Sequence, residues 1–371
     1  MLKNHLKDDM IAALNLREPE SVPVAPYVDY AYASKVSGRK VSEVILGSNE
    51  LKASVLLQAY EKHHYNWIMV FENPPRDWQR NVSINDLGDK YEVRNKDAGE
   101  KPFLLPKDGT PIYPVGDVTI ENAAEKFELE IADRDDIMRQ GRCDVTKIVK
   151  ARAGSEALVT AVVGAPFGEV LLRLGLTKGA TCLYRKPDLI RNLCELCLRR
   201  YIEEASALSE AGAEAFWVEE VFAGTDTISP THYEEFALRY EKLQIQALQR
   251  LGKPVILYFC GNPMPVIHNI AMTHADAFAF EENKKQIDVD LKGIKDVLNG
   301  EACLFGNMDA INTLTTSPDE IEEKVKQMIL KIGLRGSFVL GTGSPITKTV
   351  QPENVDAMIT AARKYGRTNS A

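Results

Sequence analysis

The stretch PVILYFC at residues 254–260 is an apolar run that ends in a thiol, directly before Gly261. A half-buried strand turns alternate side chains to the same side, so Tyr258 and Cys260 should project together while Leu257 and Phe259 face the opposite side. We therefore expect a β-strand that runs into a turn and presents a phenol and a thiol on one surface.

Apolar runs of this kind recur along the chain and are separated by helix-like segments. There are eight: VPVAPYV at 22–28, WIMVFE at 67–72, LVTAVVG at 158–164, EAFWVEE at 214–220, PVILYFC at 254–260, DAFAFEE at 276–282, ACLFGN at 302–307 and GSFVLG at 336–341. Strands that alternate with helices indicate a parallel α/β architecture, and eight of them indicate a closed (β/α)8 barrel. We expect a single domain over residues 1–371, with a helical extension before the first strand.

The segments between the strands carry their own signals. Residues 76–120, between the second and third strands, contain Gly, Asp and Pro turns between short alternating runs. This pattern predicts β-hairpins inserted on the active-site side of the barrel. Further on, Ser317-Pro318-Asp319-Glu320 has the spacing of a capping box with proline at the first helical position, and Gly333 marks the expected end of that helix.

Composition excludes several classes of protein. The 371 residues are 44% hydrophobic and 26% charged, and the net charge of −8 argues against a nucleic-acid surface. No run of about 18 apolar residues predicts a membrane span, and the N-terminus lacks the pattern of a signal peptide. The six cysteines do not form a small disulfide scaffold and indicate reduced thiols. We expect a cytoplasmic protein.

The active site of such a barrel lies at the carboxyl ends of its strands. The polar residues at these positions are Asp29, Glu72, Asn73, Glu219, Glu220, Tyr258, Cys260, Glu281, Glu282, Asn307, Asp309, Thr342 and Ser344. We select Tyr258 and Glu219 as candidate catalytic residues. The candidate substrate-binding residues are Asp29, Asn73, Asn307 and Ser344.

Carboxylates and a thiolate from neighbouring strands suggest a metal site. In DAFAFEE the phenylalanines should face the outer helices, which leaves Glu281 rather than Glu282 toward the barrel axis. For Glu219 and Glu220 the alternation is less clear. Such ligands could hold a borderline-soft ion such as zinc with an open position. The alternative is that Cys260 is a small buried side chain and that the glutamates bind loop amides or an arginine.

The glycine-rich run GTGSP at 341–345, after the last strand, also has two interpretations. Many barrels bind a phosphate after their seventh and eighth strands, where a glycine-rich loop cradles it. The alternative is a tight turn without a ligand.

Four segments carry a resemblance to a known family. They are REPESVPVAPYVDYAYASKVSG, PVILYFCGN, LFGNMDAINTLTTSPDEIEEKV and FVLGTGSPITKTVQPENVDAMITAARKYG. They resemble the uroporphyrinogen decarboxylase-like superfamily and, more narrowly, its cobamide-dependent methyltransferase branch. The resemblance covers nearly the whole chain and implies a (β/α)8 barrel. The arginine-rich motif of true decarboxylases is absent from VPVAPYVDYA, which argues against decarboxylation.

The resemblance also implies a set of zinc ligands. Members that methylate thiols commonly carry His-x-Cys at the end of strand five and a second cysteine in a Gly-Cys-Gly loop after strand eight. Cys260 matches the first cysteine, but Tyr258 stands in place of the histidine and Ser344 in place of the second cysteine. Either the site is metal-free, or it is rebuilt from neighbouring strands. Similar O-demethylating methyltransferases often use carboxylate ligands, which favours zinc held by Glu220, Cys260 and Glu281.

This resemblance implies methyl transfer from a methoxylated small molecule to the Co(I) centre of a separate corrinoid protein. An aromatic methyl donor is one option. Zinc would bind the ether oxygen, and Tyr258 would hydrogen-bond that oxygen or donate a proton to it. The hairpins of 76–120 would shape the pocket. The alternatives are methyl transfer from methyl-corrinoid to a thiol or folate, porphyrinogen-type decarboxylation, and a non-catalytic binding barrel. Relatives suggest a monomer or a homodimer.

Overall fold

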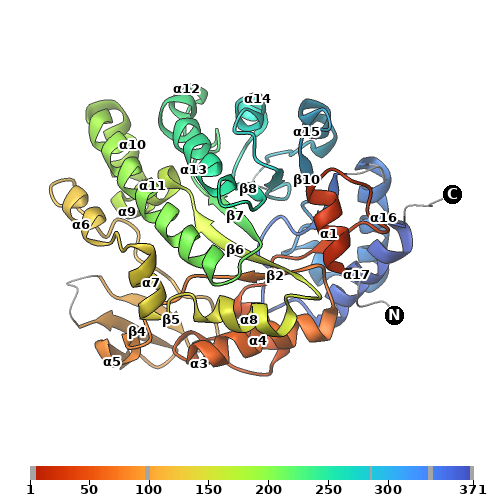
Figure 1. Cartoon of the computed structure of the whole chain (residues 1–371), viewed down its shortest axis with the longest axis horizontal. Helices are drawn as coiled ribbons and strands as arrows, with labels where there is room; N and C mark the ends of the chain where they lie inside the picture. Colours follow the sequence, from red (N-terminus) through yellow and green to blue (C-terminus); the bar gives the residue numbers. More distant parts are fainter. Residues whose placement is uncertain (1–5, 97–100, 285, 333–336, 368–371) are drawn as a thin grey trace.

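The computed structural model describes residues 6–96, 101–284, 286–332 and 337–367. Eight parallel strands form a nearly closed barrel, and helices surround it (Figure 1). The barrel strands are β1 (Val24–Ala25), β2 (Trp67–Val70), β6 (Leu158–Gly164), β7 (Ala215–Glu220), β8 (Val255–Phe259), β9 (Ala277–Phe280), β10 (Cys303–Phe305) and β11 (Phe338–Gly341). All eight predicted strands and the (β/α)8 class are confirmed.

The strands pair in the order β1-β11-β10-β9-β8-β7-β6-β2. The two ends of this order meet at Asn66, whose backbone N–H donates to the carbonyl of Val24 at 2.8 Å. The side chain of Asn66 accepts from the N–H of Val24 at the same distance. These two bonds hold β1 beside the start of β2 and complete the ring.

The helices lie outside the ring. Those up to β6 are α1 (Leu6–Leu14), α2 (Tyr30–Val36), α3 (Val41–Ile45), α4 (Asn49–His63), α5 (Trp78–Asn81), α6 (Ala123–Leu129), α7 (Arg134–Gln140) and α8 (Asp144–Ala153). From β6 to β8 they are α9 (Pro166–Leu174), α10 (Leu176–Arg185), α11 (Pro187–Glu210), α12 (Pro230–His232), the π-helix η2 (Tyr233–Leu238) and α13 (Arg239–Gln249). After β8 come the 3₁₀ turn η3 (Met264–Val266), α14 (Ile267–Ala271), α15 (Leu291–Leu298), the 3₁₀ turn η4 (Thr313–Thr315), α16 (Pro318–Ile332) and α17 (Pro352–Tyr365).

The start of α16 shows how the sequence sets a helix boundary. The Glu320 N–H donates to Ser317 Oγ, and the Ser317 N–H donates to Glu320 Oε2, both at 3.3 Å. This reciprocal pair is the predicted capping box, which satisfies backbone donors that the first helical turn leaves free. The predicted end at Gly333 lies outside the described residues.

The segment between β2 and β6 forms a small antiparallel sheet, as predicted for residues 76–120. It consists of β3 (Val82–Asp86), β4 (Lys90–Asn95) and β5 (Phe103–Pro106), paired in that order. Its buried residues Val82, Val93 and Leu105 form a separate apolar cluster that packs on Ile45 of α3. In Figure 1 this sheet lies beside α3 and α5, at the side of the barrel.

Aromatic side chains fill the barrel interior. Trp217 contacts Trp67, Phe305 and Tyr258, and its closest ring neighbour is Tyr258 at 4.9 Å between centroids. Tyr27 lies edge-on to both Trp217 and Tyr258. Because each ring fixes its neighbours, this layer forms a rigid floor beneath the carboxyl ends of the strands.

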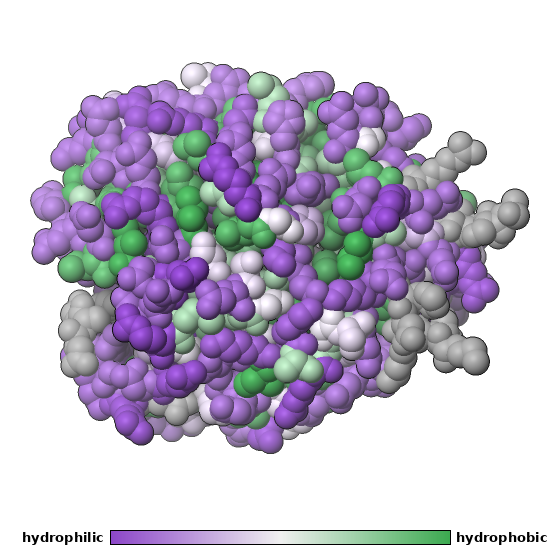
Figure 2. Space-filling view, viewed as in Figure 1, coloured by the Kyte–Doolittle hydropathy of each residue, from purple (hydrophilic) through white to green (hydrophobic). Residues whose placement is uncertain are grey.

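The surface carries mainly hydrophilic residues. On the face in Figure 2, hydrophobic residues lie in separate groups among them. Within the described part of the chain, no helix is both long enough and apolar enough to cross a membrane.

Candidate active site

Glu219 and Tyr27 form the centre of a polar cluster at the carboxyl ends of β1 and β7. The Tyr27 hydroxyl donates to Glu219 Oε1 at 2.5 Å, and the indole N–H of Trp217 donates to the same oxygen at 3.1 Å. Burial raises the pKa of Glu219 above its usual range, and the nearby carboxylate of Asp29 raises it further, against the two hydrogen bonds. A carboxyl group with a raised pKa can hold a proton for transfer.

Tyr258, Cys260 and Glu281 continue this cluster across β8 and β9. The Tyr258 hydroxyl donates to the carbonyl of Gly343 at 2.7 Å, and it also lies in hydrogen-bonding contact with the thiol of Cys260. Burial and the carboxylate of Glu281 raise the pKa of the Cys260 thiol well above its usual value. Glu281 accepts from the Gly261 N–H at 2.8 Å and pairs with Lys284. In this arrangement Cys260 is a neutral thiol.

Glu220 does not join the cluster, which departs from its predicted role as a metal ligand. Its Oε1 accepts from the Phe222 N–H at 3.2 Å and lies against Gly168 of α9. It is fully buried, and its charge acts on Glu241 of α13 and on Tyr233. Strand alternation is the reason, because Glu219 follows Trp217 into the barrel and Glu220 therefore faces the helices.

The four predicted substrate-binding residues lie at strand ends, where each is engaged in hydrogen bonds. Asp29 caps α2 by accepting from the Ala31 and Tyr32 N–H groups. The side chain of Asn73 accepts from the Tyr30 hydroxyl at 3.2 Å, and it also lines a cavity. The remaining two fix loops: Asn307 donates to the carbonyl of Glu281, and Ser344 donates to the buried carboxylate of Glu282 at 2.7 and 2.9 Å.

The positions of Glu220, Cys260 and Glu281 decide whether these three side chains could bind zinc. Cys260 and Glu281 lie together, but Glu220 is on the other face of the sheet, and Glu281 is already paired with Lys284. Among the described residues, no three His, Cys, Asp or Glu side chains are grouped so that they could hold a metal ion. The predicted ligand set Glu220, Cys260 and Glu281 is therefore not formed in this arrangement.

The loop at 341–345 is tied to its surroundings. Thr342 accepts from the Tyr27 N–H at 3.0 Å and donates to the carbonyl of Ser344. Gly343 packs so closely on Glu282 that a Cβ at this position would meet the Glu282 nitrogen at 2.3 Å. Only glycine permits this approach. The geometry matches a tight turn.

A cavity of about 640 Å³ lies beside the cluster, between the inserted sheet and the barrel. Its size is in the usual range for small-molecule sites. It adjoins the cluster through Tyr30, which follows Asp29 in sequence and donates to Asn73. Its lining is Tyr30, Ile45, Lys52, Phe71, Glu72, Asn73, Pro74, Trp78, Lys101, Phe103, Tyr113, Pro114, Asp117, Glu130, Leu172 and Arg173.

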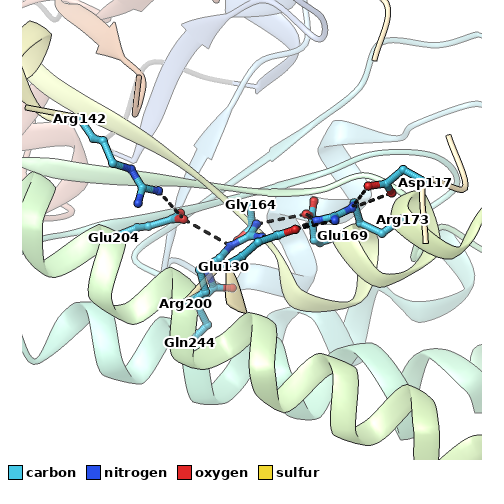
Figure 3. A network of polar contacts seen from close by, with 9 residues as sticks. All are labelled: Asp117, Glu130, Arg142, Gly164, Glu169, Arg173, Arg200, Glu204 and Gln244. Atoms are coloured by element: carbon cyan, nitrogen blue, oxygen red, sulfur yellow. Dashed lines mark hydrogen bonds and ion pairs between the residues drawn. The ribbon is translucent and has the colours of Figure 1, made fainter. Parts of the chain in front are cut away.

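A network of largely half-buried charges supports one wall of this cavity (Figure 3). Arg173 reaches the cavity carboxylates Asp117 and Glu130, each at 2.7 Å. Behind it, Arg200 pairs with Glu130 at 3.0 Å, Glu169 at 3.1 Å and Glu204 at 3.3 Å. Because these groups neutralise one another, the wall is rigid and carries little excess charge.

Tyr27, Lys284 and Lys52 are not among the residues that the sequence predicts for the site. Tyr27 is an aromatic residue within the apolar run of the first predicted strand. Only the folded barrel shows that its hydroxyl reaches Glu219. Lys284 follows β9 by four residues and could have been found as the cation nearest to Glu281 and Glu282. Lys52 lies within α4, where a lysine is ordinarily read as solvent-exposed.

An eight-stranded parallel barrel with polar side chains gathered at the carboxyl ends of its strands defines the (β/α)8 class of fold. The sequence model for uroporphyrinogen decarboxylase (URO-D) matches residues 106–365, more than half of the chain, so the chain belongs to this family. The resemblance drawn from the sequence is thereby confirmed at the level of the family.

Relatives in the family carry two different activities in their names. The chain is 28% identical to a uroporphyrinogen decarboxylase of Trichlorobacter lovleyi over 50% of its length and 52% of that protein. It is 25% identical to a methylcobamide:CoM methyltransferase of Methanosarcina mazei over 59% of its length and 62% of that protein. The matched region thus spans between about half and two thirds of these relatives.

A solved methyltransferase from Methanosarcina mazei has the same fold. It superimposes with a TM-score of 0.72 at 20% identity, covering 97% of this chain and 99% of that one. This similarity supports the barrel and its elaborations as a unit.

Proposed function

We propose that this protein is a corrinoid-dependent methyltransferase of the O-demethylating type, which moves a methyl group from a methoxylated small molecule to a separate corrinoid protein. The observation that carries the proposal is the half-buried Glu219, held by Tyr27 and Trp217 with a raised pKa at the barrel mouth. The methylcobamide-using relative and the methyltransferase structure support the general class.

The chemistry requires a proton on the oxygen that the methyl group leaves. When the carbon–oxygen bond breaks, both electrons stay on that oxygen, so a nearby acid stabilises the leaving group. Among the described residues, both hydrogen bonds to Glu219 reach Oε1, which leaves Oε2 for a substrate. Glu219 in its protonated form would donate to the leaving oxygen. The corrinoid, carried by the partner, supplies the Co(I) nucleophile.

Tyr258 and Cys260 would shape the site rather than exchange protons. Burial raises the pKa of Tyr258 well above its usual value, so its hydroxyl stays protonated and donates to Gly343. Its ring stacks on Trp217. Together with the neutral thiol of Cys260, it would exclude water from the reacting methyl group.

Zinc is not part of this mechanism, because the predicted ligands are not brought together.

The partner in the proposal is a corrinoid protein that docks over the mouth. The chain would act as a monomer or a homodimer. A Co(I) acceptor and the free thiols indicate a reducing compartment, and we place the reaction in the cytoplasm.

Porphyrinogen decarboxylation is the alternative that the decarboxylase relatives raise. The carboxylates of a porphyrinogen need several cations around them. At this mouth, the charged groups are mainly Glu219, Glu281 and Asp29, and Lys284 is already paired with Glu281. The electrostatics therefore favour a neutral ether group at the reacting centre.

The test is methyl transfer with purified components. The full chain, a reduced corrinoid protein and a panel of methoxylated compounds would be mixed without oxygen, and methylation of cobalt would be followed by absorbance. We expect methylation that depends on the chain and is abolished by Glu219→Ala. Decarboxylation of a porphyrinogen, with no methylation from any methoxylated compound, would overturn the proposal.

A further inference from the structure

The cavity beside the cluster has two aromatic walls. Phe103 of the inserted sheet lies 6.5 Å from Trp78, with the rings nearly parallel, and 5.2 Å from Tyr113. On the barrel side, Tyr30 and Phe71 lie 5.4 Å apart. Aromatic walls on both sides of one cavity favour a planar ligand, because rings stack or meet edge-to-face.

Lys52 of α4 lines this cavity and is 4% exposed. Within the described residues its side-chain ammonium has no hydrogen bond and no ion pair, and burial alone lowers its pKa to about 8. A buried lysine without a partner is costly. The other charged side chains of the cavity are engaged: Glu72 with Arg142, Asp117 and Glu130 with Arg173, and Lys101 with the carbonyl of Gly116.

A smaller hollow of about 210 Å³ also includes Lys52. Its other charged groups are Arg76 and Asp144, which pair with each other at 2.5 Å, and Glu50, which is exposed and hydrogen-bonds with Ser48 rather than with Lys52. Neither hollow therefore provides an internal counter-ion for Lys52, and a ligand is the remaining source of one.

We propose that this cavity binds a planar aromatic monoanion, whose carboxylate pairs with Lys52 while its ring lies between the two aromatic walls. One unpaired cation matches one negative charge. A phosphate or a dicarboxylate would need further donors, whereas the carboxylates Glu72, Asp117 and Glu130 around the cavity would repel the extra charge.

The position of the cavity links this ligand to the barrel mouth. The side chain of Tyr30 lines the cavity, and its hydroxyl donates to Asn73. Tyr30 directly follows Asp29 of the polar cluster in the sequence. If the bound anion is the methyl donor, the substrate class is a methoxylated aromatic carboxylate. That last step rests on the proposed function, whereas the binding site itself does not.

Binding can be measured on the full chain without a corrinoid protein. The probes are para-methoxybenzoate, the neutral para-methoxybenzyl alcohol, and acetate, which has the charge without the ring, each titrated by calorimetry. The variant is Lys52→Met, which keeps the length of the side chain and removes the charge. The control is Lys62→Met on the same helix, where the side chain is 46% exposed. Thermal unfolding confirms that both variants fold.

We expect para-methoxybenzoate to bind the wild type and the Lys62 variant, and to lose about ten-fold to a hundred-fold in affinity in Lys52→Met, as for a hydrogen bond to a charged group. The alcohol should bind more weakly and be insensitive to Lys52. Equal affinity of the wild type and Lys52→Met, or no binding by the wild type, would overturn the assignment. Binding without methyl transfer would leave the site standing and refute only the proposed function.

Discussion

The Tyr27 hydroxyl donates to Glu219 Oε1 at 2.5 Å, and this bond joins two strand ends that are 192 residues apart in the chain. It fixes the Glu219 carboxyl group over the aromatic layer formed by Trp217 and Tyr258. A half-buried acid held in one orientation is suited to proton donation, because little reorganisation is needed when the substrate reacts.

The first prediction concerns Glu219→Gln. The variant retains an acceptor for Tyr27 and Trp217 but loses the transferable proton, so we expect methyl transfer to fall about 10²-fold to 10⁴-fold, the usual contribution of a general acid. In the wild type the protonated form is active. Because the pKa of Glu219 is raised, the rate should hold across mildly acidic pH and fall as the pH rises through that pKa, as a rate profile would show.

The matched control is Glu220→Gln, the same change at the adjacent residue. Glu220 faces the helices, so the rate and its pH profile should stay close to those of the wild type. Equal losses in both variants would show that the distinction between the two faces of β7 is false.

The second prediction concerns stability at Glu220. Burial raises the pKa of Glu220 to about 7 against several backbone hydrogen bonds, and the charge of Glu220 in turn raises the pKa of Glu241. Because the folded protein holds this proton more tightly than the unfolded chain, its stabilising effect is complete below the ordinary pKa and is lost as the pH rises through the folded value. Glutamine cannot ionise. In alkaline buffer, Glu220→Gln should therefore have a free energy of unfolding higher than that of the wild type by on the order of 2 kcal/mol, measured by denaturant titration.

The gain should vanish in acidic buffer, where both proteins are neutral at this position. Glu195→Gln, at an exposed position on α11, serves as the comparison and should change little at any pH. A pH-independent effect at Glu220 would mean that packing, rather than ionisation, controls its contribution.

The third prediction tests the charge network with adjacent arginines. Arg200→Ala would remove the shorter of two arginine contacts from both Glu169 and Glu204, leaving Arg173 at 3.5 Å from Glu169 and Arg142 at 3.6 Å from Glu204. We expect a loss of about 3 kcal/mol in the free energy of unfolding, the lower end of the range for breaking a buried ion pair, because each glutamate keeps a longer arginine contact. Arg199→Ala removes only an exposed contact of 3.9 Å to Glu128 and should cost about 0–1 kcal/mol. Similar losses in denaturant titrations of the two variants would refute a special role for the network.

Much of the barrel could be predicted from the sequence, because strand alternation and apolar runs are local patterns. Glu281 was assigned to the axis from the phenylalanines of its strand, and it does lie beside Cys260. The same reasoning failed to separate Glu219 from Glu220. On β7 the bulky Trp217 points inward and stacks on Tyr258, whereas on β9 the residues that alternate with the phenylalanines are the small Ala277 and Ala279. Neighbouring strands, which the local pattern does not contain, decide which face holds the large side chain.

Lys52 and Lys284 were missed for a different reason. Both come from segments outside the strands, and a lysine in a helix or loop carries no periodic signal of burial. Their importance depends on what surrounds them in space: an aromatic cavity without a counter-ion for Lys52, and two carboxylates for Lys284.

The last prediction concerns the metal. The Tyr258 hydroxyl reaches the carbonyl of Gly343, so position 258 adjoins the loop that holds Ser344, and Cys260 lies in contact with Tyr258. The resemblance implies that histidine and cysteine at the positions of Tyr258 and Ser344 would complete a zinc site. Elemental analysis after dialysis should therefore find about one zinc per chain in the double variant Tyr258→His/Ser344→Cys and much less in the wild type. Adding Cys260→Ala should remove it. Stoichiometric zinc in the wild type would instead show that Cys260 and Glu281 recruit a third ligand, and would restore the Lewis-acid mechanism.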